Sequence, residues 1–433
     1  MTQEAIIQKV ADEVNVALAK ESQQIVKKMS MAQREQIIAN IRAMTLENAE
    51  WFANMAVEET GMGNVAHKIL KHQLVAEKTP GTEDITTTAW SGDNGLTLVE
   101  MSPFGVVGAI TPSTNPSETI ICNAIGMLAG GNTVVFSPHP SAMRTSLAAI
   151  DMINRASAAA GGPAKIAFAA SSDAVMKHKD IALIVATGGP GLVSAVLASG
   201  KRAIGAGAGN PPALVDETAD LQKAAEDIIN GATFDNNLPC IAEKAIVAVA
   251  PIADKLMRYM TVEQGCYLAS ASNLAKLEAL VFTAKGLSRD CVGKSAAVLL
   301  EQIGVTPPQG VRCIVFEGEK EHPFIAEELM MPILGMVRAA DFEDAVETAL
   351  WLEHGYRHTT HIHSKNIDHI TAYAKAMDTA ILVKNAPSYA AIGFGSEGYC
   401  SFTIASRTGE GLTSATSFTK QRRCVMAENL CIR

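Results

Sequence analysis

The sequence contains no run of apolar residues as long as the roughly eighteen that a membrane-spanning helix needs. It also lacks a secretory signal, because no basic segment followed by an apolar block stands at its start. Basic residues are fewer than acidic ones, and the net charge of −9 argues against a nucleic-acid partner, which would require a basic face. These absences predict a cytoplasmic protein that binds neither a membrane nor nucleic acid.

The eight cysteines form no Cys-x-x-Cys pair and no tight cluster with histidine. Without a zinc signature or a secretory signal, we expect reduced thiols, most of them small core residues. His358, His361 and His363 alternate in a way that could suggest a metal site. His358 and His361 are, however, an odd number of residues apart and would point to opposite faces of a strand. We therefore predict no metal site.

The chain of 433 residues is too long for one ordinary core, so two or three domains are expected. A hydrophobic content of 48% and a charged content of 19% are typical of a folded globular protein. We find no internal repeat and no low-complexity segment. Near the start, Ile6, Val10, Val14 and Leu18 recur every four residues, which predicts an amphipathic helix.

Short β-branched runs alternate with helical patterns from residue 105 onward, which predicts parallel, doubly wound sheets. Ligands of such sheets bind at the carboxyl ends of the strands. In the first half, strands are expected over 105–112, 132–138, 165–170, 181–189 and 212–216. In the second half, they are expected over 243–250, 294–300, 312–318, 334–340, 360–364 and 380–385.

Residues 84–103 differ from this alternation. Thr, Trp, Leu and Val lie on both sides of the turn Asp93-Asn94-Gly95, which predicts a β-hairpin. The tail, residues 411–430, contains one more strand-like run.

Cys240 stands at the junction of the two alternating regions, after a proline and the polar run Asp235-Asn236-Asn237. A packing thiol would more naturally lie inside an apolar run, whereas a cysteine at the mouth of one can present its sulfur to a cleft. From these residues alone, a packing role and a nucleophilic role both remain open.

Other candidate residues have similar alternatives. Asn115 follows the first strand, where its amide could donate to a developing oxyanion or could simply form a turn or helix cap. The run ATGGPG, residues 186–191, is either a phosphate-binding loop or a plain turn. Glu327 and Glu328 precede a strand, and such a pair usually forms a solvated face.

Several motifs occur together in one order, and with them the chain resembles the aldehyde dehydrogenase superfamily. Within it, the chain is most similar to the CoA-acylating branch, and there to the acetaldehyde and propionaldehyde dehydrogenases associated with bacterial microcompartments. The resemblance covers nearly the whole chain. The motifs are TPSTNP, TGG, GAGAGNPP, FDNNLPC, ELMMP and TGEGLTSA.

The resemblance implies a role for each candidate. Cys240 would be the nucleophile, and the Asn115 side chain with the Cys240 amide would form the oxyanion hole. His358 matches a histidine in the aldehyde domain of bifunctional aldehyde-alcohol dehydrogenases. The positions implied to bind NAD are Thr111, Pro112, Ser113, Ser137, Pro138, His139, Thr187, Gly188, Gly189 and Glu328. Ser137 replaces the usual lysine of the superfamily, which weakens any expectation of NADP preference.

The resemblance also implies an α/β aldehyde dehydrogenase-like fold with two doubly wound domains and a small β oligomerisation element. The expected limits are 1–83 with 104–231 for the NAD-binding domain and 232–399 for the catalytic domain. Residues 84–103 with 400–433 would form the oligomerisation element, so we expect a dimer or a tetramer.

The implied reaction converts a short-chain aldehyde, CoA and NAD reversibly to acyl-CoA and NADH through a Cys240 thioester. Hydrolytic relatives carry a glutamate in a stretch that here, from Gly205 to Pro212, holds no carboxylate. A thiol such as CoA needs less base assistance than water. The alternative is a hydrolytic aldehyde or semialdehyde dehydrogenase that releases a free acid.

The resemblance adds the bacterial microcompartment as a location and its shell as a partner. Members of that group often carry a targeting helix and a flexible linker before the catalytic body. Here the helical pattern begins almost at Met1, without a Pro/Ser/Gly-rich linker. We expect either that this extension is absent or that it has been removed.

Overall fold

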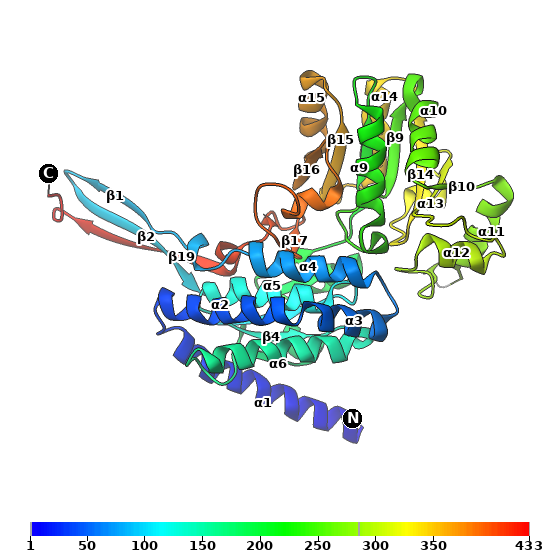
Figure 1. Cartoon of the computed structure of the whole chain (residues 1–433). Helices are drawn as coiled ribbons and strands as arrows, with labels where there is room; N and C mark the ends of the chain where they lie inside the picture. Colours follow the sequence, from blue (N-terminus) through cyan, green and yellow to red (C-terminus); the bar gives the residue numbers. More distant parts are fainter. Residues whose placement is uncertain (1, 285, 433) are drawn as a thin grey trace.

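Two parallel sheets form the two halves of the molecule, and a β arm extends from the first half (Figure 1). The computed structural model describes residues 2–284 and 286–432. The first sheet has five strands in the order β5-β4-β3-β6-β7. Its strands are β3 (Val106–Ile110), β4 (Thr133–Ser137), β5 (Ala167–Ala169), β6 (Ile181–Thr187) and β7 (Ala203–Ala206). β3 and β4 are buried at every position, as parallel strands covered on both faces must be.

Alternate residues of these strands face two different helical layers. Val134 and Phe136 of β4 pack in one core with α2, α5 and α6, whereas Val135 packs in another with α1. The helix α5 is buried along its whole length because α2 and α4 cover its outer side. The helices of this half are α1 (Gln3–Val26), α2 (Met31–Glu47), α3 (Ala49–Thr60), α4 (Val65–Lys78), α5 (Pro116–Ala129), α6 (Met143–Ala159), α7 (Ser172–Lys177) and α8 (Pro190–Leu197).

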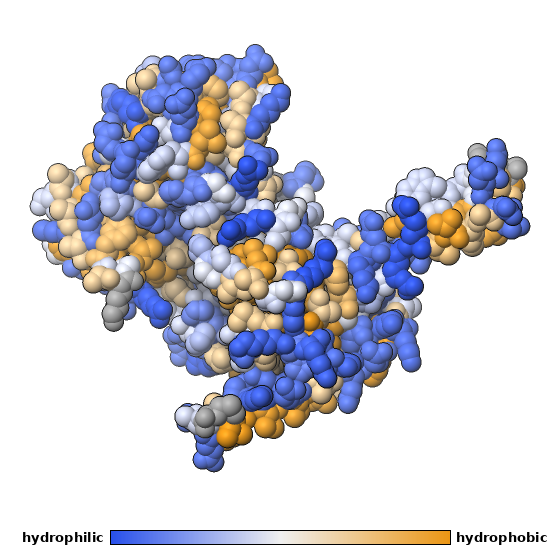
Figure 2. Space-filling model, turned by 180° about the vertical axis from the view of Figure 1, so that it is seen from behind, coloured by the Kyte–Doolittle hydropathy of each residue, from blue (hydrophilic) through white to orange (hydrophobic). Residues whose placement is uncertain are grey.

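The predicted helix at the start is confirmed, but its apolar stripe does not face the core. The face of α1 that packs on the sheet carries Val16 and Ala19, whose small side chains allow a close approach. Ile6, Val10, Val14 and Leu18 are instead exposed. Figure 2 shows the apolar side chains along the lower edge of the molecule, over α1. A four-residue repeat identified the helix but not its buried face.

The second sheet has seven strands in the order β10-β13-β14-β9-β8-β15-β16, all parallel. Its strands are β8 (Pro212–Val215), β9 (Ala245–Val249), β10 (Tyr267–Leu268), β13 (Ile314–Glu317), β14 (Ile333–Ala339), β15 (Thr359–His363) and β16 (Ile381–Lys384). The helices of this half are α9 (Leu221–Thr233), α10 (Ala250–Arg258), α11 (Ala271–Val281), α12 (Ala296–Gln302), α13 (Pro323–Ala326), α14 (Phe342–Glu353) and α15 (Ile367–Met377). Two short hairpins add β11 (Phe282–Thr283) with β12 (Gly286–Leu287) and β17 (Ile404–Ala405) with β18 (Gly411–Leu412).

Three sequence-based assignments are wrong. The strand at 212–216 belongs to the second sheet, where β8 lies between β9 and β15, and α9 follows it into the second core. Residues 294–300 form no strand: Ser295 caps α12, because its hydroxyl accepts from the amide of Val298. Ile404 and Phe418 pack in the core of the first half, so the oligomerisation arm takes from the C-terminal segment only its last strand.

The predicted hairpin and tail strand are confirmed as one antiparallel sheet. β1 (Thr88–Gly92) pairs with β2 (Gly95–Pro103), and β19 (Thr419–Ala427) pairs with the other edge of β2. The three strands extend away from both halves (Figure 1). Within residues 2–284 and 286–432, no helix combines the length and the hydrophobicity that a bilayer-spanning segment needs.

Candidate functional site

A cleft of about 1070 Å³ opens at the carboxyl ends of the strands of the first sheet, beside the loop that carries Cys240. Its volume lies near the upper end of the roughly 300–1,000 Å³ typical of small-molecule and cofactor sites. Every predicted catalytic or cofactor position except His358 lines this cleft. The structure therefore brings these predicted positions together in one cleft, although they come from segments far apart in the chain.

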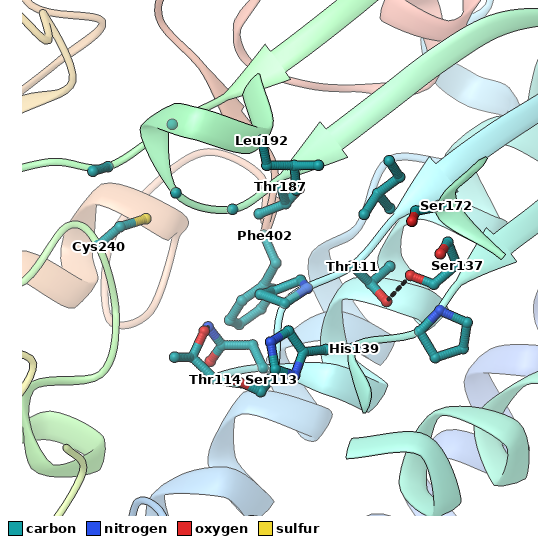
Figure 3. Close-up of a pocket in the computed structure, with 18 of the residues that line it drawn as sticks. Thr111, Ser113, Thr114, Ser137, His139, Ser172, Thr187, Leu192, Cys240 and Phe402 are labelled. Atoms are coloured by element: carbon teal, nitrogen blue, oxygen red, sulfur yellow. Dashed lines mark hydrogen bonds between the residues drawn. The ribbon is translucent and has the colours of Figure 1, made fainter. Parts of the chain in front are cut away.

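The sulfur of Cys240 points into the cleft, toward Thr187 and Phe402 (Figure 3). The side chain is partly exposed, whereas Cys122, Cys313 and most other cysteines are buried. Cys240 is thus placed as a nucleophile would be, at the surface of the cavity. The position supports this role over that of a packing thiol.

The surroundings of Cys240 disfavour ionisation of its thiol. Burial, the larger cause, and the nearby carboxylate of Glu328 together raise its pKa to about 12. Lys244 and the backbone amides of Cys240 and Ile241 act in the opposite direction. The Lys244 ammonium lies 4.0 Å from Glu328 and donates to the carbonyls of Asn237 and Pro239. The charge balance around the sulfur is therefore set by one cation and one anion.

The turn before Cys240 has an unusual backbone. Asp235, Asn236 and Asn237 have φ values of 48°, 55° and 66°, all in the left-handed region. Side-chain hydrogen bonds hold the turn: Asn236 donates to the carbonyls of Gly63 and Gly293, and Asn237 donates to those of Ala232 and Glu243. The polar run before Cys240 is thus a turn held by hydrogen bonds to four backbone carbonyls, and it fixes where Cys240 lies.

Asn115 occupies the N-cap position of α5, but its side chain makes no capping hydrogen bond. Its Nδ2 donates to Thr114 Oγ1 at 3.2 Å, and its Oδ1 accepts from Lys71 Nζ at 2.6 Å. The residue lines the cleft together with Cys240. The Asn115 oxygen binds Lys71 instead of capping the helix, and one N–H of its amide remains for the cleft beside the one that donates to Thr114, which favours the oxyanion role.

The glycine-rich loop after β6 leads directly into α8. Gly189 is the N-cap of α8, and a Cβ at this position would meet no protein atom within 4 Å. Thr187 is held by a hydrogen bond of 3.1 Å between its hydroxyl and that of Thr403. The loop thus leaves open space in front of a helix N-terminus, where an anionic group binds favourably.

His358 lies behind the cleft wall. A Cβ added at Gly209 would lie 3.0 Å from both the Cys240 carbonyl oxygen and the His358 ring, so these groups crowd the same glycine. The His358 Nδ1 is hydrogen-bonded to the hydroxyl of Thr359 at 2.8 Å, and its Nε2 has no hydrogen-bond partner within the described residues. Burial lowers the pKa of His358 to about 4, so the imidazole is neutral at neutral pH.

Among the described residues that line the cleft, Glu328 is the one carboxylate. Gly207 and Ala208 contribute the segment in which hydrolytic relatives carry their glutamate. Asn210 anchors this segment by donating to carbonyls of the second half, including that of Leu352 at 2.9 Å. The stretch without a carboxylate therefore forms part of the cleft wall.

Sequence reasoning missed several cleft residues. Gln8 and Asn15 reach the cleft from α1, and nothing in their spacing indicates this. Ala169 to Ser172 follow the carboxyl end of β5, so the general rule for parallel sheets could have found them. Phe402 comes from the C-terminal segment that sequence reasoning assigned to the oligomerisation element. The charged residues behind the wall, above all Lys71 and Lys244, were also missed.

Comparison with known proteins identifies the family. The sequence profile of the "Aldehyde dehydrogenase family" matches residues 5–399. This chain belongs to the aldehyde dehydrogenase family. Propanal dehydrogenase (CoA-propanoylating) of Salmonella typhimurium is 46% identical over 406 residues, covering 91% of this chain and 87% of that enzyme.

Solved structures of similar proteins agree with this family assignment. A propionaldehyde dehydrogenase from the Clostridium phytofermentans fucose utilisation bacterial microcompartment is 71% identical, with a TM-score of 0.96 over 96% of this chain and 98% of that one. Rhodopseudomonas palustris propionaldehyde dehydrogenase with bound propionyl-CoA is 52% identical, with a TM-score of 0.96 over 98% of this chain and 96% of that one. The same Rhodopseudomonas enzyme is also known with bound CoA and an acylated cysteine.

The cleft fits the nicotinamide cofactor that aldehyde dehydrogenases use. It offers the open loop at Gly189 in front of α8 for the anionic part of a dinucleotide. Thr111 to Ser113 and Ser137 to His139 line the same space, with the Thr111 hydroxyl facing the Ser137 carbonyl (Figure 3).

We expect the charge of Glu328 to control how readily Cys240 ionises. In Glu328→Gln, removal of the neighbouring negative charge lowers the pKa of Cys240. It stays above the ordinary thiol value of about 8.5, because burial is the larger cause of the shift. The measurement is the pH dependence of iodoacetamide labelling of Cys240, followed by mass spectrometry of its peptide. Glu327→Gln is the matched control, because Glu327 is exposed and does not line the cleft. An unchanged midpoint in Glu328→Gln would contradict the prediction.

Proposed function

We propose that this protein is a CoA-acylating aldehyde dehydrogenase. It converts a short-chain aldehyde, CoA and NAD to acyl-CoA and NADH, and the reaction is reversible. One observation carries the proposal. The Cys240 thiol lines the cleft, and the neighbouring segment from Gly205 to Pro212 holds no carboxylate. Water would need a base at that position, whereas a thiol is already partly ionised near neutral pH.

The relatives support this proposal. The similar Rhodopseudomonas enzyme binds propionyl-CoA and carries an acylated cysteine. The Clostridium phytofermentans enzyme is also known as a cysteine-to-alanine and as a histidine-to-alanine variant. The two altered residues are separated by the same number of positions as Cys240 and His358 in this chain. This spacing supports Cys240 as the nucleophile and His358 as its functional partner.

In the first half-reaction, the Cys240 thiolate forms a bond to the aldehyde carbon, and the carbonyl oxygen takes up the negative charge. The Asn115 side chain and the Cys240 amide donate to this oxygen, an effect worth roughly 3 to 4 kcal/mol per donor in comparable sites. A bound nicotinamide cofactor supplies the acceptor for the hydride of that carbon. Thr187, Gly188 and Gly189 would hold its pyrophosphate and nicotinamide region, and Glu328 would bind its nicotinamide ribose. The acyl group remains on Cys240 as a thioester.

In the second half-reaction, the sulfur of CoA attacks the thioester carbon. The new carbon–sulfur bond forms, the bond to Cys240 breaks, and Cys240 leaves as the thiolate. His358 is the base that takes the proton of the CoA thiol, since its imidazole is neutral and its Nε2 has no hydrogen-bond partner within the described residues. Run in reverse, the same steps reduce an acyl-CoA to an aldehyde.

We also propose that the chain forms a homo-oligomer through its arm. Within the described residues, no strand pairs with the outer edge of β19, and Trp90 and Val425 on the arm are exposed. Exposed strand edges readily pair with another chain. By analogy with the Clostridium phytofermentans enzyme, we place the protein in a bacterial microcompartment, with the shell as a further partner.

With aldehyde and NAD but without CoA, the enzyme should release about one NADH per active site and then nearly stop. The stretch from Gly205 to Pro212 supplies no carboxylate to activate water, and such assistance typically accelerates attack by water about a hundred- to ten-thousandfold. Addition of CoA should restart turnover. Absorbance at the NADH band in a stopped-flow experiment measures both phases.

Two cysteine variants serve as controls for this experiment. Cys240→Ala should give no burst, whereas Cys424→Ala, an exposed thiol on the arm, should behave as the unmodified protein does. Sustained NADH production without CoA, with free acid as the product, would favour a hydrolytic aldehyde dehydrogenase instead.

His358→Ala should leave the NADH burst intact and slow acyl transfer to CoA by about a hundredfold or more. The base is the neutral imidazole, and its pKa of about 4 means that this form prevails throughout pH 6 to 8. The ratio of transfer rates between the unmodified protein and the variant should therefore be flat over that range and fall toward pH 4. A ratio that already declines at pH 6.5, or a lost burst, would be incompatible with this role.

Val425→Asp should shift the protein to a smaller assembly, because a charge on an exposed strand disfavours pairing between chains. Sedimentation velocity measures the change. Ile367→Asp is the matched control, because Ile367 is equally exposed but lies on α15, away from the arm. If both variants sediment as the unmodified protein does, the arm is not the interface.

A further inference from the structure

A fully buried group of charges lies behind Asn115 and the turn that precedes Cys240. Lys68 and Lys71 of α4 point into the protein, three residues apart and therefore on one face of the helix. Their partners are the buried carboxylates of Asp235 and Glu118. Two cations and two anions balance, which allows the group to exist without water. None of these four residues has a role in the chemistry described above.

Lys71 is the member of this group that contacts the candidate oxyanion hole. Its Nζ donates to Asn115 Oδ1 at 2.6 Å and forms ion pairs with Asp235 Oδ2 at 2.5 Å and Glu118 Oε1 at 3.0 Å. Two of its three N–H donors are used in hydrogen bonds to Asn115 and Asp235, and Glu118 adds an ion pair. Burial alone would lower the pKa of Lys71, but the carboxylates of Asp235 and Glu118 raise it, so the side chain stays charged.

The contact determines which way the Asn115 amide faces. An ammonium cannot accept a hydrogen bond, so only the oxygen of the amide can lie against Lys71. The NH₂ group must then face the opposite side, toward Thr114 and the cleft that Cys240 lines. Without the lysine, the amide could rotate and present its oxygen to the developing oxyanion, which would repel it.

The same ammonium also binds the turn that precedes the nucleophile. Asp235 belongs to the left-handed turn that ends shortly before Cys240, and its second oxygen accepts from the Asn64 amide at 2.7 Å. Lys71 therefore joins α4, the start of α5 and the nucleophile's turn through one atom. The Asn115 side chain, one proposed donor, lies at the start of α5, and Cys240, which supplies the other, follows the turn closely in the chain.

We infer that Lys71 is a positioning residue for the oxyanion hole, which orients the Asn115 amide and ties it to the turn that carries Cys240. The inference rests on the proposed function, in which Asn115 donates to the oxygen of the adduct. Lys71 touches neither substrate nor cofactor in this assignment and acts through Asn115.

The test is a double-mutant cycle on the rate of the NADH burst. Asn115→Ala should slow the burst about a hundredfold or more, with little change in the aldehyde KM. Lys71→Met should slow it by up to about a hundredfold, the size expected when a catalytic group is displaced. In the Asn115→Ala background, Lys71→Met should have less than about a twofold further effect, because the group through which it acts is gone.

Lys68→Met is the matched control. Lys68 is equally buried on the same helix and binds the same Asp235 oxygen at 3.0 Å, but it donates to the Thr114 carbonyl and not to Asn115. Both lysine variants should lower Tm to a similar extent, while Lys71→Met alone should lose most of the burst rate. Lys71→Arg, which keeps the charge and the donors, should recover part of that rate and can replace Lys71→Met in the cycle if the latter does not fold.

The outcomes separate the two proposals. Equal losses of burst rate in the two lysine variants, or losses in Lys71→Met and Asn115→Ala that multiply, would show that Lys71 serves stability alone and would overturn the inference. The burst needs no CoA, so it tests Lys71 whichever way the acyl-enzyme is resolved. Steady turnover without CoA would contradict the proposed acylating function but would not change the conclusion about Lys71.

Discussion

Burial of the Cys240 thiol raises its pKa to about 12, and the rest of the site is organised around this cost of excluding water. Partial enclosure of the sulfur disfavours the thiolate that must form before the attack on the aldehyde. Lys244, itself buried, and the amides of Cys240 and Ile241 offset part of the cost. Glu328 has the opposite effect, so any event that neutralises or moves its carboxylate favours the ionised sulfur.

The buried ion pairs of Lys68, Lys71, Glu118 and Asp235 fix groups of the site in place. An oxyanion hole requires donors whose positions are fixed before the negative charge develops. Asn115 gains this fixation from a buried ammonium, and the turn at Asp235 gains it from the same atom. The ion pairs would contribute little at the surface. In the interior, where each charge needs its partner, they connect segments that are otherwise distant in the chain.

The layered α/β fold could be predicted from alternation of strands and helices, but the sheet to which a strand belongs could not. The strand β8 follows β7 closely in sequence, and nothing in its apolar residues indicates that it pairs with β9 and β15. Residues 294–300 are apolar enough for either a strand or a helix, and a serine cap decides in favour of α12. On α1, a regular stripe of large apolar residues was more conspicuous than the small residues that pack.

In the candidate site, the sequence indicated those residues that lie in loops with a distinctive motif. Asn115 and the loop at Gly188 follow the carboxyl ends of strands, where chemistry is expected, and Cys240 stands in the loop between α9 and β9. The resemblance to the aldehyde dehydrogenase superfamily then implied their roles. Lys71 and Lys244 could not be found in this way, because a lysine in a helical pattern ordinarily lies in solvent. Only the folded arrangement shows that both are buried with partners from other segments.

The three left-handed residues before Cys240 bear on how such enzymes are recognised. Aspartate and asparagine tolerate this backbone better than other residues that have a side chain, since their short polar groups can bond locally. The path of the chain thus favours the residues Asp-Asn-Asn, and for Asp235 the ion pairs with Lys68 and Lys71 are a second reason. A relative that had lost its nucleophile would still be under pressure to keep them as long as it kept the turn. The motif by which such an enzyme is most easily recognised therefore reports the shape of the loop. Whether the nucleophilic cysteine is present has to be checked separately.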